Sequence, residues 1–375
     1  MNIAINTRLL IENELEGIGR FSFEIVKRIV KKYPNIHFHL IFDRPYSKKF
    51  LFEKNVIAHV LKPKTRHPII WYYWFEIQLP KLLKNIKADL LISLDGFLTT
   101  KLNIPKINVL HDINFEHRPQ DLPFFYRNYY KYYIPKYCHV SSKIITVSNF
   151  SKYDISQKYN IPKEKIKVVY NGVSKGFYSI KTNKKNEIKK KYTSGEDYFI
   201  FIGSLHQRKN ISRMLKAFDL FKKDTGTKTK FIIVGKKRWW SNNMEKTYNN
   251  LKCKNDIIFT GYVEENILKI LISSAKCLCF VSLFEGFGLP IIEAMKCGVP
   301  LITSNTSSMP EICGKAGLIV NPENIEEISI AMQKIEKNQE LCNNLIKFGL
   351  ERAKIFNWDQ SANDFSKVID EYIKI

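Results

Sequence analysis

Short apolar runs alternate with longer amphipathic runs along almost the whole chain, and this alternation constrains the fold most. Runs of strand length such as NIAIN (2–6) and HFHLIF (37–42) are separated by helix-like segments such as FSFEIVKRIVKKY (21–33). The alternation predicts a parallel β-sheet covered by helices. It starts again at Tyr198, so the sequence predicts a second α/β unit of similar size.

The chain of 375 residues is long enough for two domains of about 100–200 residues each. We expect an N-terminal Rossmann-like domain over 1–180, a polar, charged linker over 181–197 and a second Rossmann-like domain over 198–355. Residues 356–375 are typical of a helix that packs back on the first domain. Because ligands of such sheets bind outside the carboxyl ends of the strands, functional residues should directly follow strands.

The formal net charge is +24, and residues 1–180 carry 29 of the 60 basic but only 14 of the 36 acidic residues. A basic surface attracts nucleic acid, anionic lipid or phosphorylated ligands. A composition rich in Ile, Lys and Asn could produce the same charge without selection on it, and both explanations stay open. The sequence holds no nucleic-acid recognition motif, so we expect no nucleic-acid partner.

Seven cysteines are scattered along the chain without the spacing of a zinc site. We therefore expect buried free thiols in a reducing compartment. The first residues lack the apolar core of a signal peptide, and no run reaches about 18 uninterrupted apolar residues. These features indicate a cytoplasmic protein in which any membrane contact is peripheral.

Two carboxylates flank a glycine-rich turn in FVSLFEGFGLPIIEAMKCGVPLITS (280–304). Glu285 precedes the turn, and Glu293 lies in the first turns of a helix expected from about Pro290. Such a turn places backbone N–H groups at a helix N-terminus, which favours a phosphate. Carboxylates accept hydrogen bonds from sugar hydroxyls. The structural alternative is a capping acid and an exposed helix glutamate.

This stretch resembles the E-x7-E motif of the retaining glycosyltransferases of family 4, which have the GT-B fold of two facing Rossmann-like domains. The resemblance extends through the block EGFGLPIIEAMKCGVPLITSNTSSMPEICGKAGLIVNP (285–322), its most specific part. FIGSLHQRKN (201–210) resembles the phosphate-binding loop of that family. Four segments resemble its first domain, so the resemblance covers almost the whole chain: GIGRFSFEIV (17–26), VLHD (109–112), TVSNFSKYDI (146–155) and IKVVYNGV (166–173).

The resemblance implies roles for four side chains of the second domain. Glu285 is expected to contact the transferred sugar, and Glu293 to hold the ribose hydroxyls of the nucleotide. Arg208 and Lys209 are expected to neutralise the diphosphate. That role is chemically sound, because a departing nucleoside diphosphate gains negative charge. Without the preceding strand and glycine, QRKN would indicate only a solvated basic turn.

The sequence departs from the family pattern after Gly203, where many relatives have an arginine and this chain has Ser204. Phosphate binding is therefore expected to depend more on Lys209 and on the backbone amides of the turn. These amides belong to Gly286, Phe287, Gly288 and Leu289. The nucleotide base is expected near Tyr262 and Val263, which follow a strand.

The first domain offers two groups of candidates. EGIGR places Gly17 and Gly19 in the loop after the first strand, where the resemblance implies a glycine-rich loop near the diphosphate or acceptor, with Arg20 close by. Two such glycines are more often a flexible turn. His111 and Asp112 follow the strand KINVL. The resemblance implies that His111 contacts the donor sugar, and Asp112 is a candidate to bind or activate an acceptor hydroxyl. The structural alternative for His111 is a packed histidine.

Two stretches, 71–84 and 121–138, mix aromatic residues with Lys and Arg. Aromatic rings and basic groups gather near lipid headgroups, so either stretch could form an acceptor-lipid or membrane surface. The alternative is a pair of core-packed helices with basic outer faces. We favour core packing for 71–84 and membrane contact for 121–138.

The resemblance implies a hexosyltransferase that uses a nucleotide-diphosphate sugar and retains the anomeric configuration. Because the sequence has no Asp-x-Asp triplet and the expected phosphate partners are Arg and Lys, we expect no essential metal. Its closest resemblance is to mannosyltransferases of bacterial O-antigen assembly. GDP-mannose is therefore the first expectation for the donor, ahead of UDP- and dTDP-sugars, and a polyprenyl-linked glycan is the expected acceptor. Closure of the two domains is expected to assemble the site and exclude water. The rivals are a nucleotide-sugar 2-epimerase of the same fold and, from charge alone, a nucleic-acid-binding protein.

Overall fold

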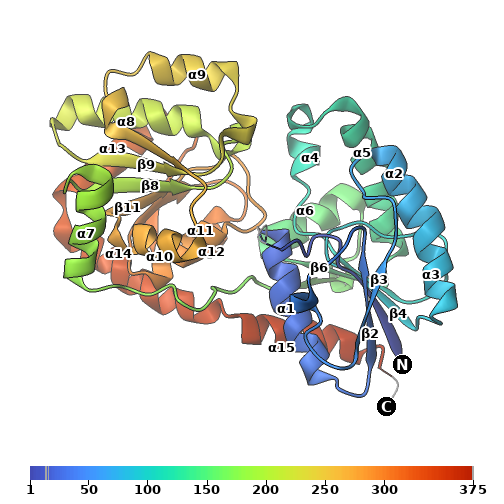
Figure 1. Cartoon of the computed structure of the whole chain (residues 1–375). Helices are drawn as coiled ribbons and strands as arrows, with labels where there is room; N and C mark the ends of the chain where they lie inside the picture. Colours follow the sequence, from blue (N-terminus) through green and yellow to red (C-terminus); the bar gives the residue numbers. More distant parts are fainter. Residues whose placement is uncertain (13–14, 16, 374–375) are drawn as a thin grey trace. The chain divides into compact units, whose positions relative to one another are not determined.

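The structure is a computed structural model that describes the chain apart from residues 13, 14, 16, 374 and 375. The chain forms two compact units (Figure 1). Unit 1 comprises Met1–Asn171 and Trp358–Ile375, and unit 2 comprises Gly172–Asn357. Each unit is built around one parallel sheet, so the GT-B-like α/β prediction is confirmed.

The sheet of unit 1 has seven strands in the spatial order β3-β2-β1-β4-β5-β6-β7, and every neighbouring pair is parallel. The central strands are buried and mostly apolar, as parallel sheets covered by helices require, and the polar residues Asn6, Ser93 and Asn108 lie at or near their carboxyl ends. The strands are β1 (Asn2–Asn6), β2 (His37–Phe42), β3 (Val56–Val60), β4 (Leu90–Ser93), β5 (Lys106–Val109), β6 (Lys143–Thr146) and β7 (Ile166–Val168).

Helices cover this sheet, and the last of them comes from the end of the chain. They are α1 (Ile18–Lys32), α2 (Pro68–Tyr73), α3 (Leu79–Asn85), α4 (Asn114–His117), α5 (Phe124–Val140), α6 (Asn149–Tyr159) and α15 (Trp358–Asp370). The apolar stripe of α1 is buried at helical spacing, with Phe21, Ile25 and Ile29 fully covered. Trp358 of α15 packs edge-on against Phe21, with 6.1 Å between the ring centroids.

The sheet of unit 2 has the order β10-β9-β8-β11-β12-β13 and is also parallel throughout. Its strands are β8 (Tyr198–Ile202), β9 (Lys230–Val234), β10 (Ile257–Gly261), β11 (Cys277–Phe280), β12 (Leu301–Ser304) and β13 (Gly317–Val320). Its helices are α7 (Thr182–Thr193), α8 (Ile211–Thr225), α9 (Asn242–Asn249), α10 (Glu265–Ser274), α11 (Leu289–Lys296), α12 (Met309–Cys313), α13 (Ile325–Lys337) and α14 (Gln339–Arg352).

Both sheets have a topological switch point, where the order of strands reverses. In unit 1 it lies between β1 and β4, and in unit 2 between β8 and β11. Ligands of doubly wound sheets bind in the crevice outside the carboxyl ends of these strands. The residues that follow β1, β4, β8 and β11 are therefore the first candidates for a functional site.

The linker expected over 181–197 is wrong, because α7 occupies most of it and lies within unit 2. Unit 2 also begins at Gly172 rather than after residue 180. The preceding segment is tied to α10, since the Ile180 N–H donates to Ser273 Oγ at 3.0 Å and that hydroxyl donates to the Tyr178 carbonyl at 3.1 Å. The polar composition that suggested a linker reflects a helix that is mostly exposed to solvent.

Two further differences concern unit 1. Strand β3, at the edge of the sheet, has no counterpart in the strands predicted from sequence, because its VIAHV run is short and only partly buried. Helix α1 begins at Ile18, so Gly19 and Arg20 lie in its first turn rather than in a loop. Gly17 remains outside the helix as its N-cap residue, with a φ of 42°.

Candidate active site

The switch point of unit 2 brings a basic turn against the loop that follows β11. The 3₁₀ turn η5 (Gln207–Lys209) is tied to this loop because the Leu283 N–H donates to the Arg208 carbonyl at 2.8 Å. The buried Asn210 side chain donates to the Val281 carbonyl at 3.0 Å. These bonds hold Arg208 and Lys209 at the carboxyl end of the sheet.

Glu285 lies at the centre of this cluster, with only 7% of its surface exposed. Lys209 Nζ donates to Glu285 Oε1 at 2.6 Å, and Arg208 Nη1 lies 3.0 Å from Glu285 Oε2. Burial alone would raise the pKa of Glu285, but the charges of Arg208 and Lys209 outweigh it and lower the pKa to about 2. The carboxylate is therefore ionised and is shared by two cations.

The backbone on either side of Glu285 is fixed by two serines that sequence reasoning did not single out. The Glu285 N–H donates to Ser307 Oγ at 3.0 Å, and Ser308 Oγ donates to the Glu285 carbonyl at 2.8 Å. Ser308 Oγ also lies 3.1 Å from the Phe287 carbonyl. Both serines follow β12, the neighbouring strand, and this position after a strand was the available signal.

The turn at 286–289 leads into α11 as expected. Gly288 has a φ of 100°, and a Cβ there would meet Ile291 Cδ1 at 3.0 Å, so a side chain would be strained and crowded. Leu289 is the first residue of α11, and Pro290 follows it. The orphan N–H groups of this helix start suit an anion, and Glu293 is half-buried within the same helix.

Adjacent strands β8, β9 and β10 end at three glycines. A Cβ on Gly235 would lie 1.9 Å from the Gly203 carbonyl oxygen, so no side chain fits there. The Gly235 N–H donates to the Gly261 carbonyl at 2.9 Å. Gly235 was missed by sequence reasoning, although IIVG ends a strand in the same way as FIG.

The two residues predicted near the nucleotide base follow this row of glycines. Tyr262 is 55% exposed, and Lys236 Nζ lies 5.0 Å from its ring centroid. Val263 is half-buried.

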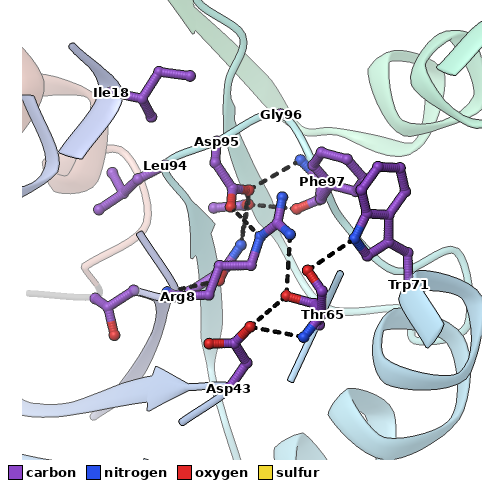
Figure 2. Close-up of polar contacts among 12 residues, drawn as sticks. Arg8, Ile18, Asp43, Thr65, Trp71, Leu94, Asp95, Gly96 and Phe97 are labelled. Atoms are coloured by element: carbon purple, nitrogen blue, oxygen red, sulfur yellow. Dashed lines mark hydrogen bonds and ion pairs between the residues drawn. The ribbon is translucent and has the colours of Figure 1, made fainter. Parts of the chain in front are cut away.

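The switch point of unit 1 holds a second buried ion pair, which sequence reasoning missed. Arg8 follows β1 and Asp95 follows β4, and Arg8 Nε donates to Asp95 Oδ2 at 2.5 Å (Figure 2). The guanidinium of Arg8 lies 4.2 Å from the ring centroid of Phe97, and its Nη1 donates to Thr65 Oγ1 at 3.2 Å. The available signal was a charged residue two positions after the end of a buried strand.

His111 and Asp112 lie after β5 in unit 1. His111 Nε2 is 3.1 Å from the Leu94 carbonyl oxygen, and the Phe21 and His111 rings pack edge-to-face with 5.0 Å between their centroids. Burial lowers the pKa of His111, and the Leu94 carbonyl and neighbouring carboxylates only partly oppose this effect. Asp112 Oδ1 accepts from the Asn114 N–H at 3.0 Å, which fixes the start of α4.

The remaining candidates of the first domain lie at the start of α1. Gly17 has open space around the position of a Cβ, Gly19 is buried, and Arg20 is half-buried. Phe21, the next residue, contacts His111. The site residues predicted from sequence thus fall into two groups. In unit 1 they are the residues at the start of α1 together with His111 and Asp112, and in unit 2 they are Glu285 and the residues near it at the carboxyl end of the sheet.

The seven cysteines are free thiols, and six of them are buried. Among the described residues no group of three or more His, Cys, Asp or Glu side chains has an arrangement suited to a metal ion. The described part of the chain also contains no helix with the length and apolar character needed to span a membrane.

Two family models match the chain and divide it much as the structure does. Residues 183–352 match "Glycosyl transferases group 1", and residues 15–176 match "Glycosyltransferase Family 4". The chain is 26% identical over 361 residues to O-antigen chain mannosyltransferase B of Escherichia coli, covering 93% of this chain and 94% of that protein. It is 29% identical over 290 residues to O-antigen chain mannosyltransferase RfbU of Salmonella typhimurium, covering 76% and 75%.

Solved structures agree on the fold. HepE from Anabaena, solved in complex with UDP and glucose, superposes with a TM-score of 0.78 at 15% identity, covering 98% of this chain and 99% of that one. The family models and the mannosyltransferase relatives therefore define a hexosyltransferase, and the fold shows that it has two Rossmann-like units. The chain belongs to the family 4 glycosyltransferases of the GT-B fold.

Proposed function

We propose that the chain transfers a hexose from a nucleotide-diphosphate sugar to a hydroxyl of a glycan or polyprenyl-linked acceptor in the assembly of bacterial surface polysaccharide. The observation that carries this proposal is the cluster at the switch point of unit 2. There Arg208 and Lys209 converge on the buried Glu285, in the loop that leads into α11. Two cations and a helix N-terminus are the groups that a diphosphate needs.

In the proposed reaction the diphosphate replaces Glu285 as the partner of Arg208 and Lys209. The bond between the sugar C1 and the phosphate oxygen breaks, and the two cations stabilise the charge that develops on the leaving diphosphate. The acceptor oxygen forms its bond to C1 on the same face, and its proton passes to the leaving phosphate, so the configuration is retained. Arg208 and Lys209 supply the positive charge, so we propose that no metal ion is required.

The remaining roles follow from position. The released Glu285 is placed to bind a hydroxyl of the transferred sugar, and Glu293 to bind the ribose. Tyr262 and Val263, after β10, are proposed to line the base. GDP-mannose is the proposed donor, because two relatives are named as mannosyltransferases of the O-antigen chain.

The proposed acceptor side is unit 1, and its surface supports peripheral contact with an anionic membrane on the cytoplasmic face. Phe124 and Phe125, at the start of α5, are 60% and 66% exposed, and Tyr132 is 57% exposed. Arg127 lies 5.6 Å from the Phe124 ring centroid, and Lys136 lies 3.5 Å from that of Tyr132. Exposed rings beside cations are typical of surfaces that contact lipid headgroups.

A thermal-shift titration with GDP, UDP, dTDP and ADP tests the donor site. A ligand that binds only the folded protein raises the melting temperature in proportion to its affinity. We expect GDP to give the largest shift and Glu293→Ala to lose most of it. Glu323→Ala, an exposed glutamate of the same unit, is the control and should keep the full shift. Absence of a shift with all four nucleotides would contradict the proposal.

A further inference from the structure

The loop that follows β4, residues 94–97, is held by a hydrogen bond at every position. We call it the switch-point loop. Its contacts are His111 Nε2 to the Leu94 carbonyl at 3.1 Å, Asn6 Nδ2 to Asp95 Oδ1 at 2.8 Å, Asn108 Nδ2 to the Gly96 carbonyl at 3.4 Å, and Ser93 Oγ to the Phe97 carbonyl. Loops at this edge of a sheet are usually mobile, so this one is unusually well fixed.

Asp95 is the anchor of the switch-point loop, and Arg8 holds Asp95. Oδ1 of Asp95 also accepts from the Phe97 N–H at 3.2 Å, while Oδ2 accepts from Arg8 Nε. Arg8 is in turn fixed by the Phe97 ring, which its guanidinium contacts, and by Thr65, whose hydroxyl donates to Asp43 (Figure 2). The side chains of Arg8 and Asp95 are only 8% and 3% exposed, so neither charge has water as an alternative partner.

The switch-point loop affects His111 because its Leu94 carbonyl is the hydrogen-bond partner of the His111 ring. A carbonyl oxygen only accepts hydrogen bonds, so the His111 Nε2 that faces it carries the proton. In the neutral ring the other nitrogen, Nδ1, is then an acceptor. The edge-to-face contact with Phe21 restricts rotation of the His111 ring. One tautomer and one ring orientation are selected, provided that the Leu94 carbonyl stays where Asp95 holds it.

We propose that Arg8 and Asp95 are positioning residues of the transfer reaction. By fixing the switch-point loop they hold His111 in its Nε2-protonated tautomer, so that Nδ1 accepts a hydrogen bond from a substrate hydroxyl. This inference rests on the proposed function, because it assigns the His111 ring to the substrate. Removing one partner of a buried ion pair also destabilises the fold. The test therefore needs a measurement that a loss of stability alone would not change.

The tautomer is measured directly by nitrogen NMR on protein labelled at its eight histidines, with His111→Gln to assign the signal. In the wild type we expect His111 to carry its proton on Nε2. Asp95→Asn keeps the shape of the side chain but removes the charge that holds Arg8, and the His111 signal should then show a mixture of tautomers. Asp121→Asn is the matched control: Asp121 pairs with Arg118 at 2.7 Å in the same unit, and the His111 signal should not change.

Kinetics separates positioning from folding. We expect Asp95→Asn to lower kcat about 10- to 100-fold, as small misplacements of catalytic groups do. The KM for the nucleotide sugar should change much less than kcat, because the proposed diphosphate ligands Arg208 and Lys209 lie in unit 2. Arg8→Lys keeps the charge but not the planar fork that spans Asp95 and Thr65, and should give the same pattern. It serves as the second variant if Asp95→Asn does not fold.

Three outcomes overturn the inference: a wild-type His111 protonated on Nδ1, a tautomer unchanged in both variants, or a changed tautomer with an unchanged kcat. The first needs no variant. A wild type that transfers no sugar from any nucleotide donor contradicts the proposed function instead, and a tautomer that still responds to Asp95→Asn then supports the positioning of His111 by itself.

Discussion

Glu285 is the residue whose surroundings say most about the site in unit 2. Its carboxylate occupies both cations that the diphosphate is proposed to use, and the pKa of Glu285 near 2 reflects how strongly they hold it. On that proposal the carboxylate and the diphosphate compete for Arg208 and Lys209. We expect this competition to limit the affinity for nucleotide and to leave Glu285 available once the diphosphate has bound.

Glu285→Gln tests this competition. The variant leaves two cations without their anion, so we expect GDP to bind more tightly by calorimetry while kcat falls about 100-fold through loss of the contact with the sugar. Unfolding should become easier by up to about 3 kcal/mol, since both cations are largely buried. Glu323→Gln, which removes the exposed partner of Arg213, is the control. Weaker GDP binding in Glu285→Gln would refute the competition.

At the scale of elements, the two neighbouring strands at one edge of the unit 1 sheet, β2 and β3, carry a histidine pair. His39 Nδ1 on β2 and His59 Nε2 on β3 lie 2.8 Å apart, which requires at least one neutral ring. Burial lowers the pKa of both, and the charges on His59 and His37 lower that of His39 further. Because the folded chain binds these protons more weakly than the unfolded chain, stability is retained above about pH 6.5 and is lost as the pH falls below it.

We expect the melting temperature of the wild type to fall more between about pH 7.5 and about pH 5.5 than the melting temperature of His59→Gln does. These two pH values lie about one unit either side of the ordinary histidine pKa. Glutamine can keep a hydrogen bond to His39 but does not titrate. His139→Gln, which changes an exposed histidine on α5, should behave like the wild type. Equal pH dependence in all three proteins would show that the pair does not affect stability.

The elements themselves show what could be predicted from sequence. Buried strands such as β8 and β11 are near-continuous apolar runs, and their positions followed from composition alone. Helix α7 was misread because a helix with little buried surface has no apolar stripe to detect. Arg8 and Asp95 were missed for a different reason: 87 residues separate them, and only the pairing of β1 with β4 brings them together.

At the scale of the whole molecule, the exposed aromatic and basic start of α5 is expected to bind vesicles. We expect flotation with vesicles containing anionic lipid to recover more protein than with neutral vesicles. Phe124→Ser combined with Phe125→Ser should abolish the difference. Phe348→Ser removes a 47% exposed ring from unit 2 and should leave it intact. Equal recovery of the wild type with both lipids would exclude a membrane role for this surface.

Helix α15 completes unit 1 although it follows all of unit 2 in the chain. During synthesis the ribosome therefore releases every strand of the first sheet long before the helix whose Trp358 covers Phe21. Unit 2 is contiguous and can fold as it emerges, whereas unit 1 must wait with its apolar α1 surface open. Nascent chains stalled before residue 358 should accordingly engage chaperones through unit 1, and chains that also expose α15 should engage them less.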